Sequence, residues 1–304
     1  MTDREEREAT GTMTVPIADL LERLDAYDPD HDTSQPLSHK DLLKRFPYPA
    51  PPKDDASSTW VSRFTNLAYC PYKIWHVVRG TPEVRPRRIQ VIVDRGKLLH
   101  AKQEVKLLAE AAVVPVATAK ELKDPKVDLV ELPEVPARVK RGDWVYIAKL
   151  DGLARLGGNL TVRERKTGRW TQMPDHLLQV WAYSIAAPGA LNDETKGLLR
   201  ANGVSWEVQY PTQGETWGPY SFRAAQLRLL EDSMDFFEDT ATRSRTEAGF
   251  DLGWSSTPSK CAPCGFAHSC SWRASGGGAA SGPTPPFTPK PDPRTVHRSL
   301  GDWQ

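Results

Sequence analysis

Residues 144–167 read WVYIAKLDGLARLGGNLTVRERKT, two strand-like runs joined by Gly157 and Gly158. A pair of glycines between two such runs predicts a β-hairpin with a two-residue turn. With these glycines as the turn, residues whose numbers add up to 315 face each other across the hairpin. Asp151 and Glu164 are such a pair, so we expect their Cβ atoms to lie about 5 Å apart on neighbouring strands.

A lysine completes this acidic pair. Strand alternation puts Lys166 on the same face as Glu164. Two carboxylates that share Mg²⁺ or Mn²⁺ beside a lysine suit hydrolysis of a phosphodiester, because the metal activates water and the lysine orients it or offsets charge. The alternative is a surface ion cluster, since an Asp separated by twelve residues from Glu-x-Lys is common by chance.

Two further motifs flank the hairpin in sequence. The run Gly96-Lys-Leu-Leu-His100 carries an imidazole on a predicted helix, and Gln179-Val-Trp-Ala-Tyr183 carries an amide and a phenol on one helix face. Considered alone, His100 is most simply interpreted as a histidine of the core. Gln179 and Tyr183 are most simply interpreted as residues on a half-buried helix face.

In this order and spacing, the motifs together resemble the RecB-type branch of the PD-(D/E)XK nuclease superfamily. The resemblance implies a metal-dependent DNA nuclease with a restriction-endonuclease-like α/β core. It implies metal ligation by His100, Asp151, Glu164 and the carbonyl of Arg165, catalysis by Asp151, Glu164 and Lys166, and DNA positioning by Gln179 and Tyr183.

All four cysteines of the chain enter a second pattern. Cys261, Cys264 and Cys270 form a C-x2-C-x5-C cluster, and Cys70 lies 191 residues before it. Four thiolates bind Zn²⁺ or a 4Fe–4S cluster, and spacing alone does not separate the two.

The sequence around Cys70, FTNLAYCPYK at residues 64–73, resembles the Cys-Pro helix of the iron–sulfur subgroup of RecB-like nucleases. That subgroup includes the fourth family of CRISPR-associated (Cas) proteins, related phage exonucleases and the nuclease modules of some helicase–nucleases. The resemblance spans about residues 60–272 and implies a structural 4Fe–4S cluster held by Cys70 and the three late cysteines.

The overall charge conceals two unlike parts. The 304 residues carry 40 basic and 39 acidic side chains, a net charge of +1. Residues 1–35 hold ten acids and three bases, which leaves +8 for residues 36–304 and makes DNA a plausible partner. We expect the acidic segment to be a solvated helix on a flexible extension, and deletion of residues 1–35 to strengthen DNA binding at low salt.

Composition limits the class of protein. A mean hydropathy of −0.53 and the lack of a long apolar run predict a soluble protein without membrane spans. The polar N-terminus and four cysteines predict a reducing, cytoplasmic location. No G-x-x-x-x-G-K-[ST] motif is present, so ATP is not implied.

The chain divides into an acidic extension (1–58), a nuclease domain with the cysteine site (59–272) and a Gly/Pro-rich disordered tail (273–304). The predicted fold is a central mixed sheet flanked by helices, with an iron–sulfur-bound helical and C-terminal subdomain. Predicted helices cover 62–79, 94–112, 174–187 and 224–246, and predicted strands cover 144–156, 159–167, 203–210 and 218–222.

The expected activity is a DNA exonuclease, with single-stranded substrate and 5′→3′ polarity implied by resemblance, in CRISPR adaptation or in phage or host recombination and repair. The alternatives are a DNA-end-binding scaffold in an integration complex, or a zinc-stabilised DNA-binding protein. Candidate DNA contacts are Arg79, Arg85, Arg87, Arg88, Arg163 and Arg169, and Lys149 either contacts a phosphate or is solvated. Trp170, Trp181 and Tyr183 are candidates for base stacking, although core packing is the favoured role of each.

Overall fold

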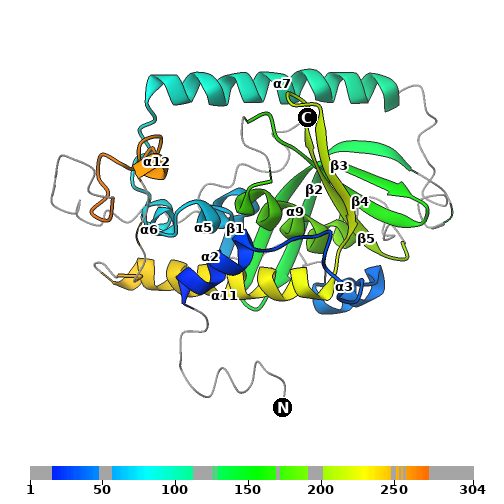
Figure 1. Cartoon of the computed structure of the whole chain (residues 1–304), viewed down its shortest axis with the longest axis horizontal. Coiled ribbons are helices and arrows are strands. Elements are labelled where there is room, and N and C mark those ends of the chain that lie inside the picture. The colour runs from blue at the N-terminus through cyan, green and yellow to red at the C-terminus, as the bar shows by residue number, and fades with distance from the viewer. Residues whose placement is uncertain are drawn as a thin grey trace, which may run out of the picture.

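A mixed six-stranded sheet forms the centre of the computed structural model (Figure 1). The structure describes residues 16–47, 57–111, 126, 129–168, 172–190, 201–247, 251–252, 255 and 258–273. Strands follow the order β1-β3-β4-β5-β6, and β2 pairs with β3. Their bounds are β1 Ser57–Trp60, β2 Leu129–Arg141, β3 Trp144–Leu156, β4 Asn159–Arg165, β5 Val204–Tyr210 and β6 Glu215–Ser221.

The β3–β4 hairpin has the predicted register. Leu156 pairs with Asn159 and Gly152 pairs with Arg163, so paired numbers add up to 315. Gly157 and Gly158 have φ values of 55° and 81°, the left-handed conformation that a type I′ turn requires at both central positions. The two glycines therefore fix which side chains face each other along the whole hairpin.

Two strands escaped the sequence analysis. β2 contains Pro133 and Pro136, which argue against a strand because proline cannot donate a ladder hydrogen bond. Among the described strands β2 pairs only with β3, so it is an edge where proline is tolerated. β1 has four residues and adds in parallel to the first half of β3.

Helices lie on both sides of the sheet. α9 (Pro174–Ala186) and α11 (Ala224–Thr246) match their predicted spans and bury residues such as Leu178, Trp181 and Phe237. The long helix α7 (Arg87–Ala111) runs along the upper edge of Figure 1, with the sheet between it and α11. It begins earlier than the predicted residue 94.

The single helix predicted over 62–79 is wrong. It is three short helices, α4 (Val61–Phe64), α5 (Asn66–Tyr69) and α6 (Tyr72–Val78). The chain is extended at Cys70, where φ is −164°, and Pro71 is the N-cap of α6, where its missing N–H needs no partner. The break leaves Cys70 at a bend instead of on a helix face.

The acidic N-terminal segment differs from the solvated helix that we expected. Ile17, Leu20, Leu21 and Leu24 of α2 (Ile17–Asp25) are buried in the main core. The chain that follows α2 also contacts the rest of the protein, because isolated β-bridges join Pro36 to Arg223 and Ser38 to Gly203. The short helix α3 (His39–Arg45) comes directly after these bridges. Deleting residues 1–35 would therefore remove part of the core together with the charge.

The remaining short elements are η1 (Ala187–Gly189) and α12 (Pro258–Cys261). No helix among the described residues is long and apolar enough to cross a membrane. The predicted flexible extension before residue 16 and the Gly/Pro-rich tail after residue 273 lie outside the described residues.

Candidate functional site

Asp151 on β3 is tied to the neighbouring strand β4. Its Oδ2 accepts a hydrogen bond from the backbone N–H of Arg165 at 2.9 Å, and its own carbonyl accepts one from Nη1 of Arg165 at 2.9 Å. The paired register ends at Gly152 and Arg163, and Asp151 and Glu164 are the next positions beyond it. The two carboxyl groups are close enough for the charge of Asp151 to act on Glu164.

Glu164 is almost completely buried, with 2% of its surface exposed. Its Oε1 lies 2.7 Å from Nζ of Lys166, whereas Oε2 has no hydrogen-bond partner among the described residues. Burial and the charge of Asp151 raise the pKa of Glu164 to about 8. A buried carboxylate with one open oxygen suits a cation, which would supply the missing partner.

Lys166 joins the hairpin to α9. Its Nζ donates to Oε1 of Gln179 at 2.6 Å, and Nε2 of Gln179 donates to the hydroxyl of Tyr183 at 2.9 Å. Burial lowers the pKa of Lys166, but the carboxylates of Glu164, Asp175 and Asp151 together outweigh burial and the net pKa is raised. The amine is therefore a fixed positive charge, and the structure brings Glu164, Lys166, Gln179 and Tyr183 into one connected network.

Helix α7 approaches this network closely. A Cβ at Gly96 would lie 3.1 Å from Oγ1 of Thr167, directly after the Lys166 segment. The glycine thus permits the helix to pack near the end of β4. His100 follows one helical turn later, and its side chain lies outside what the structure describes.

Two of the candidate DNA contacts are structural. Arg79 donates to the carbonyls of Ser244 and Glu247 at the end of α11, and its guanidinium lies 4.6 Å from the Trp75 ring centroid. Trp181 is fully buried and packs edge-on against Tyr27. The guanidinium of Arg79 is therefore engaged within the protein, and Trp181 has the core-packing role that the sequence analysis favoured over base stacking.

The other candidates have mixed outcomes. Arg85 pairs with Glu83, Lys149 with Glu134, and Arg163 with Glu207. Arg87 and Arg88 are exposed at the start of α7, and Arg169 and Trp170 lie outside the described residues. The exposed candidates Arg87 and Arg88 thus lie on the same helix as Gly96, eight or nine residues before its approach to Thr167.

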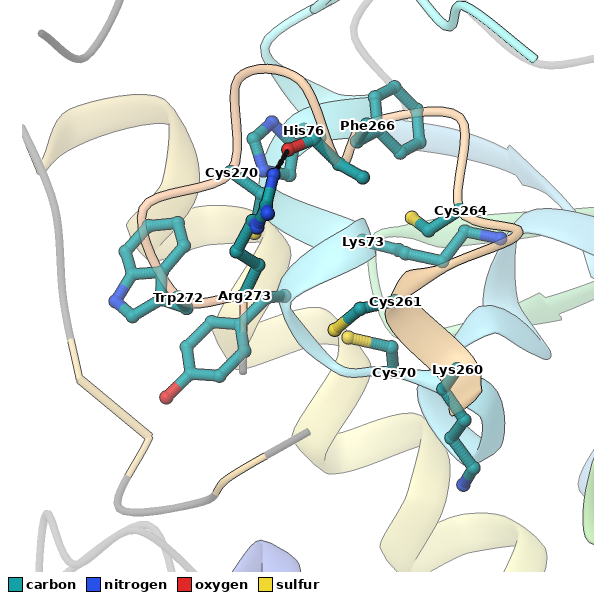
Figure 2. A pocket seen from close by; sticks show the side chains of 12 residues that line it. Cys70, Lys73, His76, Lys260, Cys261, Cys264, Phe266, Cys270, Trp272 and Arg273 are labelled. Atoms are coloured by element: carbon teal, nitrogen blue, oxygen red, sulfur yellow. Dashed lines mark hydrogen bonds between the residues drawn. The ribbon is translucent and has the colours of Figure 1, made fainter. Parts of the chain in front are cut away.

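All four cysteines line one pocket (Figure 2). Cys70 comes from the bend between α5 and α6, Cys261 ends α12, and Cys264 and Cys270 lie in the turns that follow. Two hydrogen bonds hold these distant segments together: Tyr69 hydroxyl to the Lys260 carbonyl at 2.7 Å, and the Val84 amide to the Gly265 carbonyl at 2.8 Å.

Aromatic rings surround the cysteine pocket. Tyr72 stacks on Trp272 with centroids 4.7 Å apart, and His76 stacks on Phe266 at 5.1 Å. No cysteine is in a disulfide. Burial, reinforced by the neighbouring cysteines, raises the pKa of Cys270 to about 11, so a group that binds here must displace its proton.

The sequence analysis missed His76 and three cationic side chains of this pocket, Lys73, Lys260 and Arg273. The available signal was proximity, because Lys73 and His76 directly follow Cys70 while Lys260 and Arg273 bracket the late cysteines. Burial and its neighbours lower the pKa of His76 to about 4, which keeps the imidazole neutral. Among the described residues no group of three or more His, Cys, Asp or Glu side chains has the arrangement of a single-metal site.

Comparisons with known proteins were sparse. No family model matches the chain, and no curated protein matches it. A solved structure entitled "Crystal structure of SSO0001" is similar with a TM-score of 0.39 and 12% identity, over 86% of this chain and 100% of that chain. A likeness this distant does not show a family.

Proposed function

We propose that this protein is a metal-dependent DNA exonuclease of the iron–sulfur RecB-like type, with a PD-(D/E)XK core that hydrolyses phosphodiesters of single-stranded DNA. One observation carries the proposal: the buried Glu164 offers Oε1 to Lys166 and keeps Oε2 without a partner beside Asp151. The same arrangement argues against a surface ion cluster, because only 3% of the Glu164 side chain and 19% of the Lys166 side chain are exposed.

Asp151 and Glu164 would hold Mg²⁺ or Mn²⁺, with His100 and the Arg165 carbonyl as further ligands by resemblance. The cation would lower the pKa of a bound water and neutralise charge on the phosphate. The hydrogen bond from the Arg165 backbone N–H restrains Oδ2 of the Asp151 carboxylate. Burial of Glu164 removes competing water from its open oxygen.

Lys166 would orient the attacking water or offset charge that develops on the phosphate. Gln179 restricts the amine to one position, because its amide accepts from Lys166 and donates to Tyr183. The network keeps Lys166 charged and aimed at the space next to Glu164. Such fixed geometry is what proximity catalysis requires.

DNA would approach as a polyanion. Residues 36–304 carry a net charge of +8, and Arg87 and Arg88 are exposed on the helix that packs beside Thr167. Phosphate contacts of this kind give affinity that falls with salt. The preference for single-stranded DNA and the 5′→3′ polarity rest on the sequence resemblance to the nuclease subgroup alone.

For the cysteine pocket we propose a structural 4Fe–4S cluster. Its four thiolates bind four different irons, so they stand farther apart than the ligands of a single ion. A cluster with four thiolates is an anion, and Lys73, Lys260 and Arg273 line the same pocket. The cluster would join the α5–α6 bend to the segment after α12 across nearly 200 residues of chain.

The nuclease proposal is tested with anaerobically purified protein, Mn²⁺ and end-labelled single-stranded DNA. We expect degradation by wild type and by Lys44→Ala, an exposed lysine on α3 outside the network, and none by Asp151→Ala or Lys166→Ala. Circular dichroism checks that each variant folds. Full activity in both site variants, or a wild type that binds DNA without cutting it, would reject the nuclease and favour the scaffold alternative.

The cluster is tested separately by absorption and metal analysis. A brown protein with broad absorption near about 400 nm and comparable iron and sulfide contents supports a 4Fe–4S cluster. Cys70→Ser should lose most of this absorption. A colourless protein that contains stoichiometric zinc would reject the 4Fe–4S cluster and support the zinc site instead.

A further inference from the structure

His76 lies in the wall of the cysteine pocket, and this inference rests on the proposed cluster. The residue belongs to α6, the helix that directly follows Cys70, and only 1% of its surface is exposed. It lines the same pocket as all four cysteines. A histidine is polar, so complete burial at this place requires partners for both ring nitrogens.

The packing holds the imidazole in one orientation. Its face stacks on Phe266 with an interplanar angle of 6°, and Trp75 and Trp272 meet it edge-on. Nδ1 lies 3.3 Å from Oγ1 of Thr81, whose backbone N–H also donates to the His76 carbonyl at 2.9 Å. Ring rotation would break these contacts, so the second nitrogen has a fixed direction.

That second nitrogen, Nε2, is buried and has no hydrogen-bond partner among the described residues. A buried polar atom without a partner costs about 1–3 kcal/mol. When the Thr81 hydroxyl donates to Nδ1, the ring proton resides on Nε2 and needs an acceptor. The cationic side chains of the pocket, Lys73, Lys260 and Arg273, cannot accept, whereas sulfur can.

We propose that the Nε2–H of His76 donates a hydrogen bond to a sulfur of the cluster, either a sulfide or a cysteine thiolate, and thereby raises its reduction potential. Reduction adds negative charge that is shared with the sulfurs, so a hydrogen-bond donor stabilises the reduced form more than the oxidised form. His76 is a positioning and tuning residue and not a ligand, because four cysteines already complete the cluster. The cofactor then has an adjusted electronic state in addition to its structural role.

The test compares His76→Phe, which keeps an aromatic ring against Phe266, with His76→Gln, which keeps a donor. The matched control is His31→Gln, because His31 is an exposed histidine that pairs with Asp28 outside the cysteine pocket. Potentials are measured by dithionite titration followed by electron paramagnetic resonance. We expect a more negative potential in His76→Phe, a smaller shift in His76→Gln and no shift in the control.

A second measurement can be made on wild type alone. With ¹⁵N-labelled histidine, the reduced cluster should couple to one histidine nitrogen and to a proton that exchanges in D₂O. Where His76→Phe retains a cluster, it should lose both signals. If His76→Phe fails to retain a cluster, the wild-type coupling alone decides. Absence of this coupling, an unchanged potential in an intact His76→Phe, or zinc in place of iron overturns the proposal.

These readouts use the resting protein without DNA or Mn²⁺. If wild type fails to degrade DNA, the nuclease proposal fails, but a reduction potential that depends on His76 would still support the hydrogen bond. If wild type degrades DNA and the potential does not depend on His76, only the hydrogen-bond proposal fails. The two proposals therefore fail by different measurements.

Discussion

Nζ of Lys166, the residue directly after β4, lies 2.7 Å from Oε1 of Glu164 near the end of that strand. Residues two positions apart in an extended chain turn their side chains to the same face, so the two groups can meet. Gln179 completes the arrangement from α9 by accepting from the same amine. The contact between Glu164 and Lys166 is thus stabilised by α9, a helix that begins eight residues after Lys166, at Pro174.

Gln179 offers a graded test of this network. We expect Gln179→Leu to lower the turnover of DNA by up to about 100-fold, because a misplaced Lys166 loses its fixed orientation. DNA affinity should change much less, so turnover and affinity are measured separately. Gln90→Leu, which removes a surface hydrogen bond to Asp94 on α7, is the matched control. Equal losses in both variants would assign the effect to general destabilisation.

Glu164 predicts a pH-dependent stability. Its pKa is raised from 4.5 to about 8 in the metal-free protein, so the folded state retains a proton that the unfolded chain releases between these pH values. The stability that this group contributes therefore decreases as pH rises through that window. In EDTA we expect Glu164→Gln to melt above wild type by a margin that widens toward pH 8.

Added Mn²⁺ should narrow or reverse this margin, because only wild type provides an ionised carboxylate for the cation. Melting curves at pH 5, 6, 7 and 8 with EDTA or Mn²⁺ give the comparison. If the difference in melting temperature between Glu164→Gln and wild type does not change with pH in EDTA, the raised pKa of the buried Glu164 carboxyl is contradicted.

The N-terminal helix predicts a stability effect. Leu20 is fully buried, so Leu20→Ala should reduce the free energy of unfolding by about 2–5 kcal/mol in urea titrations. Leu98→Ala on α7, where 56% of the leucine is exposed, should change it by less than about 0.5 kcal/mol. Similar small values for both would mean that α2 is not part of the cooperative core.

The acidic face of α2 can be tested without disturbing its buried face. Asp19, Glu22 and Asp25 are exposed, and α2 packs against α9. We expect the combined Asp19→Asn, Glu22→Gln, Asp25→Asn variant to bind single-stranded DNA several-fold more tightly at low salt, with the difference lost at high salt. Fluorescence anisotropy measures both, and equal affinity at low salt would leave the acids as ordinary surface charge.

Much of the fold was predictable because local signals agreed with the tertiary structure. Gly157 and Gly158 fixed the hairpin register, and Pro174 marked the start of α9. β2 was missed because its prolines contradict a central strand and only the sheet order reveals an edge. Trp181 packs in the core, the role favoured from sequence, although sequence alone left base stacking open because an aromatic residue next to site residues has the same signature in both cases.

The sequence by itself determined the register that opposes Asp151 to Glu164, the shared face of Glu164 and Lys166, and the grouping of three late cysteines, since all of these depend on short-range geometry. Only the tertiary structure decided what surrounds them. Burial, the open Oε2 of Glu164, the anchoring of Lys166 by Gln179 and the approach of Cys70 to the late cysteines arise from contacts between distant segments. Such contacts depend on how the helices and the sheet pack as whole bodies, which residue spacing does not specify.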